Sequence, residues 1–415
     1  MSSAPATPRT HAKAWRNAVF VVFALNGVAS ASWMTRIPSV RDQLDISVTE
    51  IGFLFFALSA GALVGVTLSS HVVNAIGGRS TIVIAIAITS VGMLGVGAGT
   101  ELIASYWVVL PAAALIGLGF GLCDVAMNIE GAATERVLGG TLMPLFHASW
   151  SIGTVAGAGI GSLAAFTHTG TGVHLSITAV VVMVGTVVAA RWIPRIDIPV
   201  DGATTHTGVA TGLALRERMA VWGNPRILLI GLIALGMTFT EGSANDWLAL
   251  GFVDDRGLDN GQGALVFAIF TAAMTVGRIV GVPALNRFGR VRILRAASIA
   301  AALGIATVIL VPIVPIAIVG VIVWGVGASL GFPVALSAAG DDPRTATAAV
   351  GAVSTIGYIA FLAGPPVLGV IGEHIGVLNA LVVVLVLIVV TAFAVPAARP
   401  IVGAPAASTP GTVDR

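Results

Sequence analysis

Charged residues are scarce in this chain, and their scarcity excludes an ordinary soluble protein. Asp, Glu, Lys and Arg make up 10% of the 415 residues, whereas soluble globular domains carry about 25%. Hydrophobic residues account for 56%, and the mean hydropathy is +0.99. The composition therefore indicates an integral membrane protein.

Cysteine is nearly absent, and so are the motifs of enzymes. Cys123 is the single cysteine, so no disulfide can form within the chain. The sequence contains no Walker phosphate loop, no ordered set of metal ligands and no nucleophile motif, and the glycines of GAGIG (157–161) follow no strand. We therefore expect neither an enzyme nor a bound cofactor, and we expect an ion gradient to drive any uphill transport.

The sequence contains many long apolar runs. Twelve of them, about 20 residues each, can cross a hydrocarbon core of about 30 Å as helices. The longest polar stretch divides them into two sets of six. We expect an all-α membrane protein with a disordered cytoplasmic tail at 1–14, six-helix bundles at 15–193 and 225–397, a cytoplasmic linker at 194–224 and a second tail at 398–415.

The basic residues predict the orientation of the chain. If the N-terminus is cytoplasmic, most Lys and Arg residues fall in cytoplasmic segments, and only Arg36, Arg41 and Arg256 fall toward the outside. We therefore expect both termini inside. Because the sequence contains no transit peptide, we expect a plasma membrane, which for a bacterium is the inner membrane. The pI near 9.2 reflects this topology, so we expect no nucleic-acid partner.

An internal repeat supports two equivalent halves. Trp33 and Trp247 align, with an offset of one residue, when SASWMTRIPSV in the first half is compared with SANDWLALGFV in the second. In the same way VVNAIGGR, which ends at Arg79, resembles ALNRFGR, which ends at Arg290. Two parallel six-helix repeats predict a solute path at their interface and alternating access by rocking of the halves.

The second of these loops resembles a family motif. LNRFGRVR is similar to the Gly-x-x-x-Asp-Arg-x-Gly-Arg-Lys/Arg loop of the major facilitator superfamily, although Asn286 and Asn74 replace its Asp. The resemblance implies the twelve-helix fold of that superfamily and a transport function. It also implies that Arg79, Arg287 and Arg290 brace the inner gate, without the usual charge relay in the first half.

Further motifs resemble the fucose-permease-like branch and the bacterial inner-membrane YbjJ-type group. GLCDVAMN resembles the fourth-span pattern of that branch, with Asp124 as its acid and Asn128 as its amide. FHASWSIG resembles the start of the fifth span, where His147 takes the sugar-facing place. TEGSANDW keeps the spacing from Glu to Trp of the seventh span. One departure is Met34, which stands where the branch has a proton-coupling Asp.

The fourth apolar span carries two acids that differ in position. Asp124 and Asn128 share a helix face with two glycines, so this face points into the bundle, where Asp124 is either a solute or proton site or a structural carboxyl. Glu130 lies about 120° around the helix, near the inner boundary. We expect Glu130 to be a gate or interface charge that pairs with an inner arginine.

The seventh span repeats this arrangement. Glu241 and Asn245 form an i, i+4 pair, and Asp246 and Trp247 follow toward the outer end. Asp246 is either a solvated outer residue or a partner of Arg36. Arg36 itself either snorkels to the interface or neutralises an acid across the cavity.

Other polar and aromatic side chains are candidates for solute contact. Asn26, Ser30 and Trp33 share one face of the first span and are expected to line the cavity. His147 titrates in a range that suits proton coupling, but it also fits an ordinary interfacial residue. Trp150 and Trp247 are candidate walls for a sugar ring, and Asn128 and Asn245 are further candidates for solute binding.

Arg278 shares a face of the eighth span with Thr271 and Thr275, and we expect it to brace the loop that follows. It completes a group of candidate gating or charge-pair residues: Arg36, Asp246, Glu130, Arg79, Arg278, Arg287 and Arg290.

Three functions are compatible with these residues. The first is a proton-coupled symporter of a small polar solute such as a sugar, polyol or related metabolite, working as a monomer in the lipid bilayer, with Asp124 and Glu241 as the proton-coupling candidates. The second is a proton antiporter that exports drugs or metabolites, but the exporter pattern Gly-x-x-x-Gly-Pro is broken here by Ala158. The third is a non-transporting sensor or scaffold.

Overall fold

The computed structural model describes residues 9–138, 142–194, 220–342 and 345–400, and every regular element in them is a helix. The first half contains α1 (Arg9–Met34), α2 (Ile37–Leu44), α3 (Val48–Ile76), α4 (Gly78–Glu101), α5 (Tyr106–Leu138), α6 (Met143–Phe166) and α7 (Thr171–Ala190). The second half contains α9 (Pro225–Arg256), α10 (Asn260–Phe288), α11 (Arg290–Leu310), α12 (Val314–Ala328), α13 (Gly331–Ala339), α14 (Ala346–Ile375), α15 (Val377–Ala380) and α16 (Val382–Ala394). Short 3-10 helices, η1 (Val221–Gly223) and η2 (Val395–Ala398), flank the second half.

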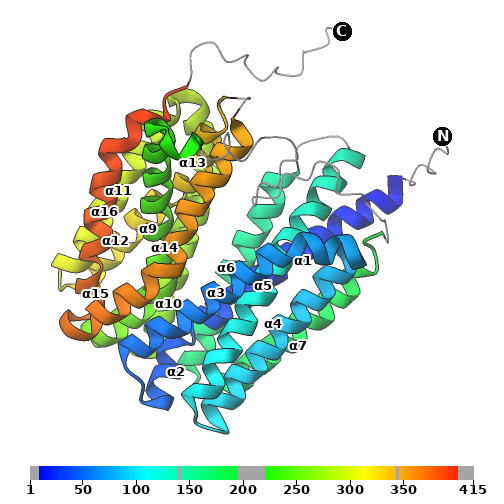
Figure 1. Ribbon diagram of the computed structural model, residues 1–415. Coiled ribbons are helices and arrows are strands. Elements are labelled where there is room, and N and C mark those ends of the chain that lie inside the picture. The colour runs from blue at the N-terminus through cyan, green and yellow to red at the C-terminus, as the bar shows by residue number, and fades with distance from the viewer. Residues whose placement is uncertain (1–8, 139–141, 195–219, 343–344, 401–415) are drawn as a thin grey trace.

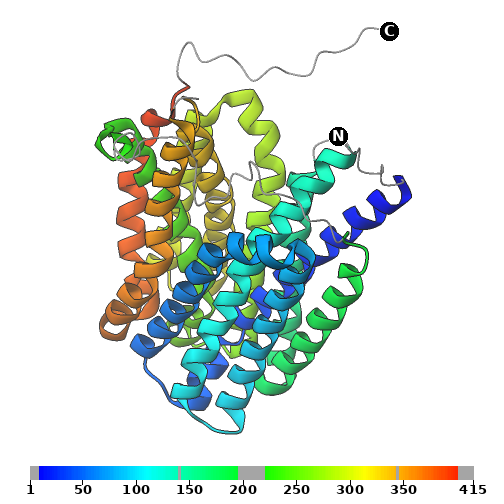
Figure 2. The ribbon, with the colours of Figure 1, turned by 45° about the vertical axis from the view of Figure 1, so that its right-hand side comes forward.

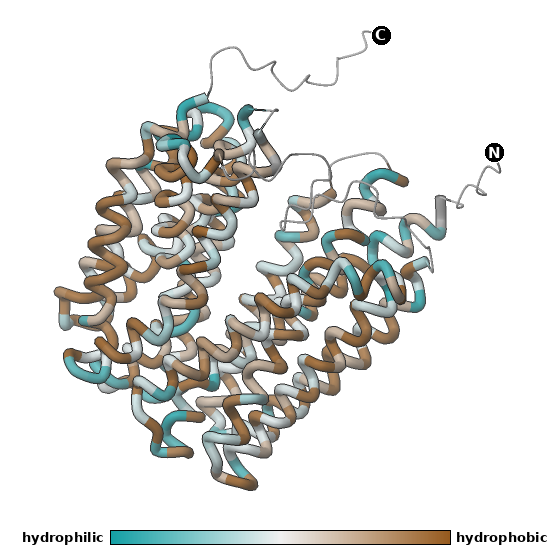
Figure 3. Tube along the Cα trace, in the orientation of Figure 1, coloured by the Kyte–Doolittle hydropathy of each residue, from teal (hydrophilic) through white to brown (hydrophobic). Residues whose placement is uncertain are grey.

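The helices have the length and hydropathy of membrane spans. Among the described residues, 11 helical segments are long and apolar enough to cross a membrane, with α1–α2, α12–α13 and α15–η2 each forming one segment. Helix α6 is not among these 11 segments. It has 24 residues, but its many Gly, Ser and Thr residues lower its mean hydropathy. Hydrophobic residues cover most of the length of the helices, and hydrophilic ones gather at the helix ends (Figure 3). The predicted all-α membrane fold is confirmed.

The two sets of helices form two bundles that diverge toward the chain termini. They meet at the opposite ends of the helices, near α2 and the α14–α15 turn (Figures 1 and 2). Helix α3 contacts α14, and α6 contacts α10, across this junction. The ribbons of the two bundles are farthest apart on the side where α1 begins and η2 ends, which we call the side of the termini (Figure 1).

Part of the predicted N-terminal tail is helical. Helix α1 begins at Arg9, so the tail predicted at 1–14 is helical from residue 9. Residues 1–8, together with 195–219 of the predicted linker and 401–415 of the second tail, lie outside the described residues.

Matching turns in the two halves support the repeat. Gly77 joins α3 to α4 with φ 80° and ψ 157°, and Gly289 joins α10 to α11 with φ 77° and ψ 158°. Only glycine adopts this backbone region at low cost. The two loops that resemble each other in sequence therefore have the same conformation.

Glycines bring helices of the first half into close contact. A Cβ on Gly117 of α5 would lie 1.8 Å from the Leu58 oxygen of α3, and one on Gly121 would lie 2.1 Å from the Ala62 oxygen. In α6, a Cβ on Gly153 would lie 2.0 Å from the Ala24 oxygen of α1. These contacts are those expected of small-residue packing in a membrane bundle.

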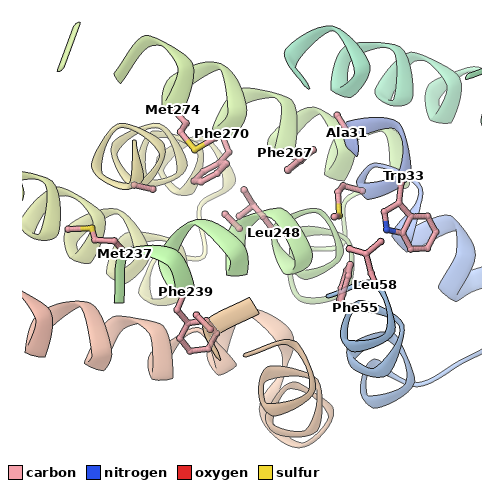
Figure 4. Close-up of a cluster of buried hydrophobic side chains, with 14 of the residues drawn as sticks. Ala31, Trp33, Phe55, Leu58, Met237, Phe239, Leu248, Phe267, Phe270 and Met274 are labelled. Carbon is pink, nitrogen blue, oxygen red and sulfur yellow. The ribbon is translucent and has the colours of Figure 1, made fainter. Parts of the chain in front are cut away.

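An apolar cluster fills the junction between the halves. Phe55 of α3 and Trp247 of α9 pack edge to face with ring centroids 5.4 Å apart. Figure 4 shows Trp33, Phe55 and Leu58 of the first half beside side chains of α9 and α10 that include Leu248 and Phe267. This cluster closes the side of the molecule opposite the termini.

Candidate solute cavity between the two halves

A cavity of about 1080 Å³ lies between the bundles. Its walls come from α5 and α6 of the first half and from α9, α10 and the α12–α13 region of the second half. Pro144, Arg290, Asp341 and Pro400 line its mouth, which therefore opens on the side of the termini. The cavity lies where the repeat predicted a solute path.

An ion pair stands in the wall of the cavity formed by the second half. Arg278 of α10 donates from Nη2 to Glu241 Oε1 of α9 at 2.9 Å, and the two side chains are 30% and 18% exposed. Arg278 also donates from Nε to the Ser329 oxygen at 3.3 Å and from Nη1 to Ser151 Oγ of α6 at 3.5 Å. Arg278 therefore reaches both halves, and does not brace the following loop as predicted.

The contact with Ser329 has a local cause. Helix α12 ends at Ala328 and α13 begins at Gly331, so one membrane-crossing segment is broken there. The last carbonyls of a helix have no partner within it, and they carry the negative end of its dipole. The guanidinium of Arg278 satisfies one of these carbonyls with a positive charge.

Asp124 lines the cavity from the opposite wall. Its side chain is exposed, and Asn128 donates to its main-chain oxygen at 2.8 Å and to its Oδ1 at 3.2 Å. Tyr358 of α14 lies within electrostatic range of the carboxylate. The structure thus places Asp124 and Glu241, one acid from each half, around the same cavity.

Two predicted solute contacts on α6 also line the cavity. His147 is exposed, and its ring packs edge-on against Phe23 with centroids 5.4 Å apart. Trp150 stands one turn further along the same helix. The other predicted solute contacts are not among the lining residues in this conformation: Asn26, Ser30, Trp33, Asn128, Asn245 and Trp247.

The face of α1 that carries Asn26, Ser30 and Trp33 is packed inside the protein and does not reach the cavity. Asn26 is 5% exposed and Trp33 is fully buried. The indole nitrogens of Trp33 and Trp247 have no hydrogen-bond partner among the described residues.

The predicted pairing of Arg36 with Asp246 is wrong. Arg36 is 2% exposed and donates instead to the Thr169 oxygen at 2.5 Å and to Thr171 Oγ1 at 3.2 Å, both in the first half. Its burial also excludes snorkelling. Neither Arg36 nor Asp246 belongs to an ion pair of the described residues.

The predicted pairing of Glu130 with an inner arginine is also wrong. Glu130 is 3% exposed, and it accepts a hydrogen bond from Trp15 Nε1 of α1 at 3.0 Å. Its Oε1 lies beside Gly78, the first residue of α4, where a Cβ would come within 2.2 Å. A carboxylate is favoured at a helix N-terminus, so Glu130 ties together α1, α4 and α5.

The candidate gating arginines differ between the halves. In the second half Asp341 accepts hydrogen bonds from both terminal nitrogens of Arg290. It also accepts one from Arg226 Nη2 at 2.9 Å. In the first half Arg79 makes one side-chain hydrogen bond to the part of the chain that the structure describes, a long one of 3.5 Å to the Ile193 oxygen. Arg287 lies over the Phe288 ring at 5.3 Å. Sequence reasoning missed Asp341, whose place at the end of the tenth span was the available signal.

Polar contacts join the two halves on the side opposite the termini. They are Arg41 to Asp254 at 2.6 Å, Asn260 to Asp42 at 2.9 Å, and the Thr49 main-chain nitrogen to Glu373 at 3.1 Å. Together with the apolar cluster, they close that side, so the cavity has access from one side of the bundle.

Comparison with known proteins identifies the class of this fold. The family model of the Major Facilitator Superfamily matches residues 19–365 and 247–412. Two relatives are similar over most of their length. The transporter y4wD of Sinorhizobium fredii is 31% identical over 364 residues, which cover 86% of this chain and 91% of the relative. The membrane protein MosC of Rhizobium meliloti is 26% identical over 379 residues, which cover 91% of this chain and 88% of MosC.

Solved structures of transporters share the fold. The nucleoside transporter NupG superposes with a TM-score of 0.73 at 17% identity, over 92% of this chain and 98% of NupG. FucP in the outward conformation superposes with a TM-score of 0.62 at 12% identity, over 93% of this chain and 99% of FucP. The chain belongs to the Major Facilitator Superfamily, so it is a multi-pass membrane transporter and not an enzyme. Its relatives are bacterial, which is consistent with the inner membrane.

Proposed function

We propose that this protein is a secondary active transporter that carries a small polar solute together with protons by alternating access. The observation that carries the proposal is a cavity between the two halves with one acid in each wall, Asp124 and Glu241. The cavity is open on one side, while polar and apolar contacts close the other. If both termini are cytoplasmic, as the basic residues predict, this is the inward-open form.

The lining of the cavity favours a sugar, a polyol or a related metabolite. Its volume is slightly above the usual range for small-molecule sites, about 300–1,000 Å³. The Trp150 ring offers a face for a sugar ring, and Ser151, Glu241 and Arg278 offer hydrogen-bond donors and acceptors for hydroxyl groups. Two neighbours in fold, a nucleoside transporter and a fucose:proton symporter, add support for a polar ring compound.

The two acids supply the proton-coupling candidates. An intramembrane carboxyl is costly unless it is paired or protonated, so such residues commonly serve a transport pathway. Glu241 is paired with Arg278, and Asp124 lies exposed to the cavity with Asn128 beside it. In this proposal one bundle encloses the whole path, and the protein works as a monomer.

Flux in proteoliposomes tests the proposal. An inward proton gradient should drive the accumulation of at least one radiolabelled solute from a panel of sugars, polyols and their acids by the wild type. At least one of the variants Asp124→Asn and Glu241→Gln should abolish accumulation while leaving exchange. The matched control is Asp45→Asn, because Asp45 is exposed in the turn after α2 and Asn tolerates its left-handed conformation. Accumulation by Asp124→Asn equal to wild type would remove Asp124 from coupling, and flux driven only by an outward gradient would identify an exporter.

A further inference from the structure

The hydrogen bonds of Arg278 leave one part of its guanidinium available for exchange. The Nε group is committed to the broken helix through the Ser329 oxygen. Arg278 lines the cavity, and its two terminal nitrogens contact two other lining residues: Nη2 donates to Glu241 at 2.9 Å, and Nη1 makes a long contact with Ser151 at 3.5 Å. These two nitrogens form the planar fork that binds carboxylates in a bidentate manner.

Glu241 therefore occupies a position that a carboxylate of the solute would fit. We propose, building on the transport function above, that the solute carries a carboxylate, which replaces the Glu241 carboxylate on Arg278 when Glu241 takes up a proton. The proton binds to the released Glu241 oxygen, and the solute anion binds to the two terminal nitrogens of Arg278. No covalent bond is made or broken.

Charge conservation in the cavity explains why the two events are coupled. Arg278 and Glu241 form a neutral pair before binding. After one proton and one carboxylate have entered, Arg278 and the solute form a neutral pair and Glu241 is neutral. A solute anion without a proton, or a proton without the anion, would leave an unbalanced charge in a partly buried site, which is costly.

The other charged groups around the cavity are placed differently. Arg290 is held by Asp341 at the mouth, so its guanidinium already has a carboxylate. Asp124 of α5 and His147 of α6 face Glu241 across the cavity, and Tyr358 of α14 lies near Asp124. The lining residues of α13 carry no titratable group. Arg278 is thus the cation whose partner can change when a proton arrives.

Binding to purified protein tests the inference with matched probes. The probes are lactate, glycerate, gluconate and glucuronate, and their neutral counterparts propane-1,2-diol, glycerol, sorbitol and glucose. Thermal shift and calorimetry are measured at pH 5.5 and pH 8. For the wild type we expect at least one carboxylate to bind and its neutral counterpart not to, with affinity falling up to about tenfold per pH unit, as linkage to one proton requires.

Two variants make the test specific to the pair. Glu241→Gln removes the competing charge but keeps the size of the side chain, so it should bind the same carboxylate with less than about twofold change between the two pH values. Arg278→Lys keeps the charge but loses the planar fork, and should weaken carboxylate binding at both pH values. Proton uptake measured with a pH dye in weakly buffered solution should be about one per bound anion for the wild type and none for Glu241→Gln.

The failures are distinguishable. Binding of neutral probes without their carboxylate counterparts, or an unchanged pH dependence in Glu241→Gln, overturns the inference while transport of a polar solute stands. The absence of carboxylate binding to both the wild type and Glu241→Gln also overturns it. The absence of flux of any solute in proteoliposomes overturns the proposed function itself. A melting curve without ligand shows whether each variant is folded.

Discussion

Arg41 of α2 and Asp254 of α9 form an ion pair of 2.6 Å that crosses from one half of the molecule to the other. The contact lies on the side opposite the termini, next to the apolar cluster around Phe55 and Trp247. The same two halves are apart on the side of the termini, where the cavity opens. In an alternating-access cycle this pair has to break when the cavity opens toward the other side.

Replacement of Arg41 should shift the protein toward the form that opens on the side opposite the termini. A partly exposed ion pair contributes about 1 kcal/mol or less, so Arg41→Gln should change the ratio of the two forms by up to about fivefold. Spin labels at Gln43→Cys and His374→Cys, which are exposed in the two halves near this junction, would report a longer distance. The native Cys123 is buried and does not interfere.

The charge reversal provides the control for this prediction. Arg41→Asp combined with Asp254→Arg restores opposite charges and should return the distance distribution toward that of the wild type. An unchanged distribution in Arg41→Gln would show that the pair does not hold the junction.

Gly117→Ala should destabilise the protein. Its Cβ would lie 1.8 Å from the Leu58 oxygen, so α3 and α5 have to move apart, and overpacking of this kind costs about 1–3 kcal/mol. Gly159→Ala is the matched control, because Gly159 is also within a helix but has no neighbouring atom within 4 Å of its Cβ position. Melting temperatures in detergent should fall for Gly117→Ala only; equal values would show that the two helices accept a wider separation.

Glu130→Ala should lower stability without changing solute affinity. The substitution leaves the buried indole N–H of Trp15 without its acceptor, at a cost of about 1–3 kcal/mol. Glu130→Gln keeps an acceptor oxygen and should lose less. Thermal stability and the KM for transport are measured together. A changed KM with unchanged stability would return Glu130 to the role of a gate, as the sequence had indicated.

Asp341→Asn should destabilise the second half. The carboxylate joins Arg226 at the start of α9 to Arg290 at the start of α11. Its removal leaves two partly buried cations without their partner, and we expect a loss of about 1–3 kcal/mol.

The corresponding position in the first half supplies the comparison. Arg79→Gln removes only a 3.5 Å contact to a main-chain oxygen and should have a smaller effect. Denaturation followed by circular dichroism measures both variants. Equal losses would contradict the asymmetry between the two loops.

The repeat, the helical membrane fold and the presence of a cavity between the halves could be predicted because they depend on local properties. Span length depends on apolar runs, and the matching turns at Gly77 and Gly289 depend on residues that adopt a rare backbone conformation. The cavity acids Asp124 and Glu241 could be found because a charged residue in an apolar run is conspicuous in the sequence.

The partners of the charged side chains required the tertiary structure. Arg36 was expected to meet Asp246 and lies against Thr169 and Thr171 instead, and Glu130 was expected to meet an arginine and bonds Trp15. Such pairings depend on the rotation and separation of helices that are far apart in the sequence, and helical periodicity specifies only the face on which a residue lies.

By itself the sequence determined that this protein lies in a membrane and that its helices form two repeated halves. It also determined the few polar residues from which a solute site could be built. All three depend on composition and local spacing. The tertiary structure decided which of those groups meet. It put Arg278 between Glu241, the broken end of α12 and Ser151 of the other half, since only the packing of α10 against its neighbours brings these atoms within hydrogen-bond distance.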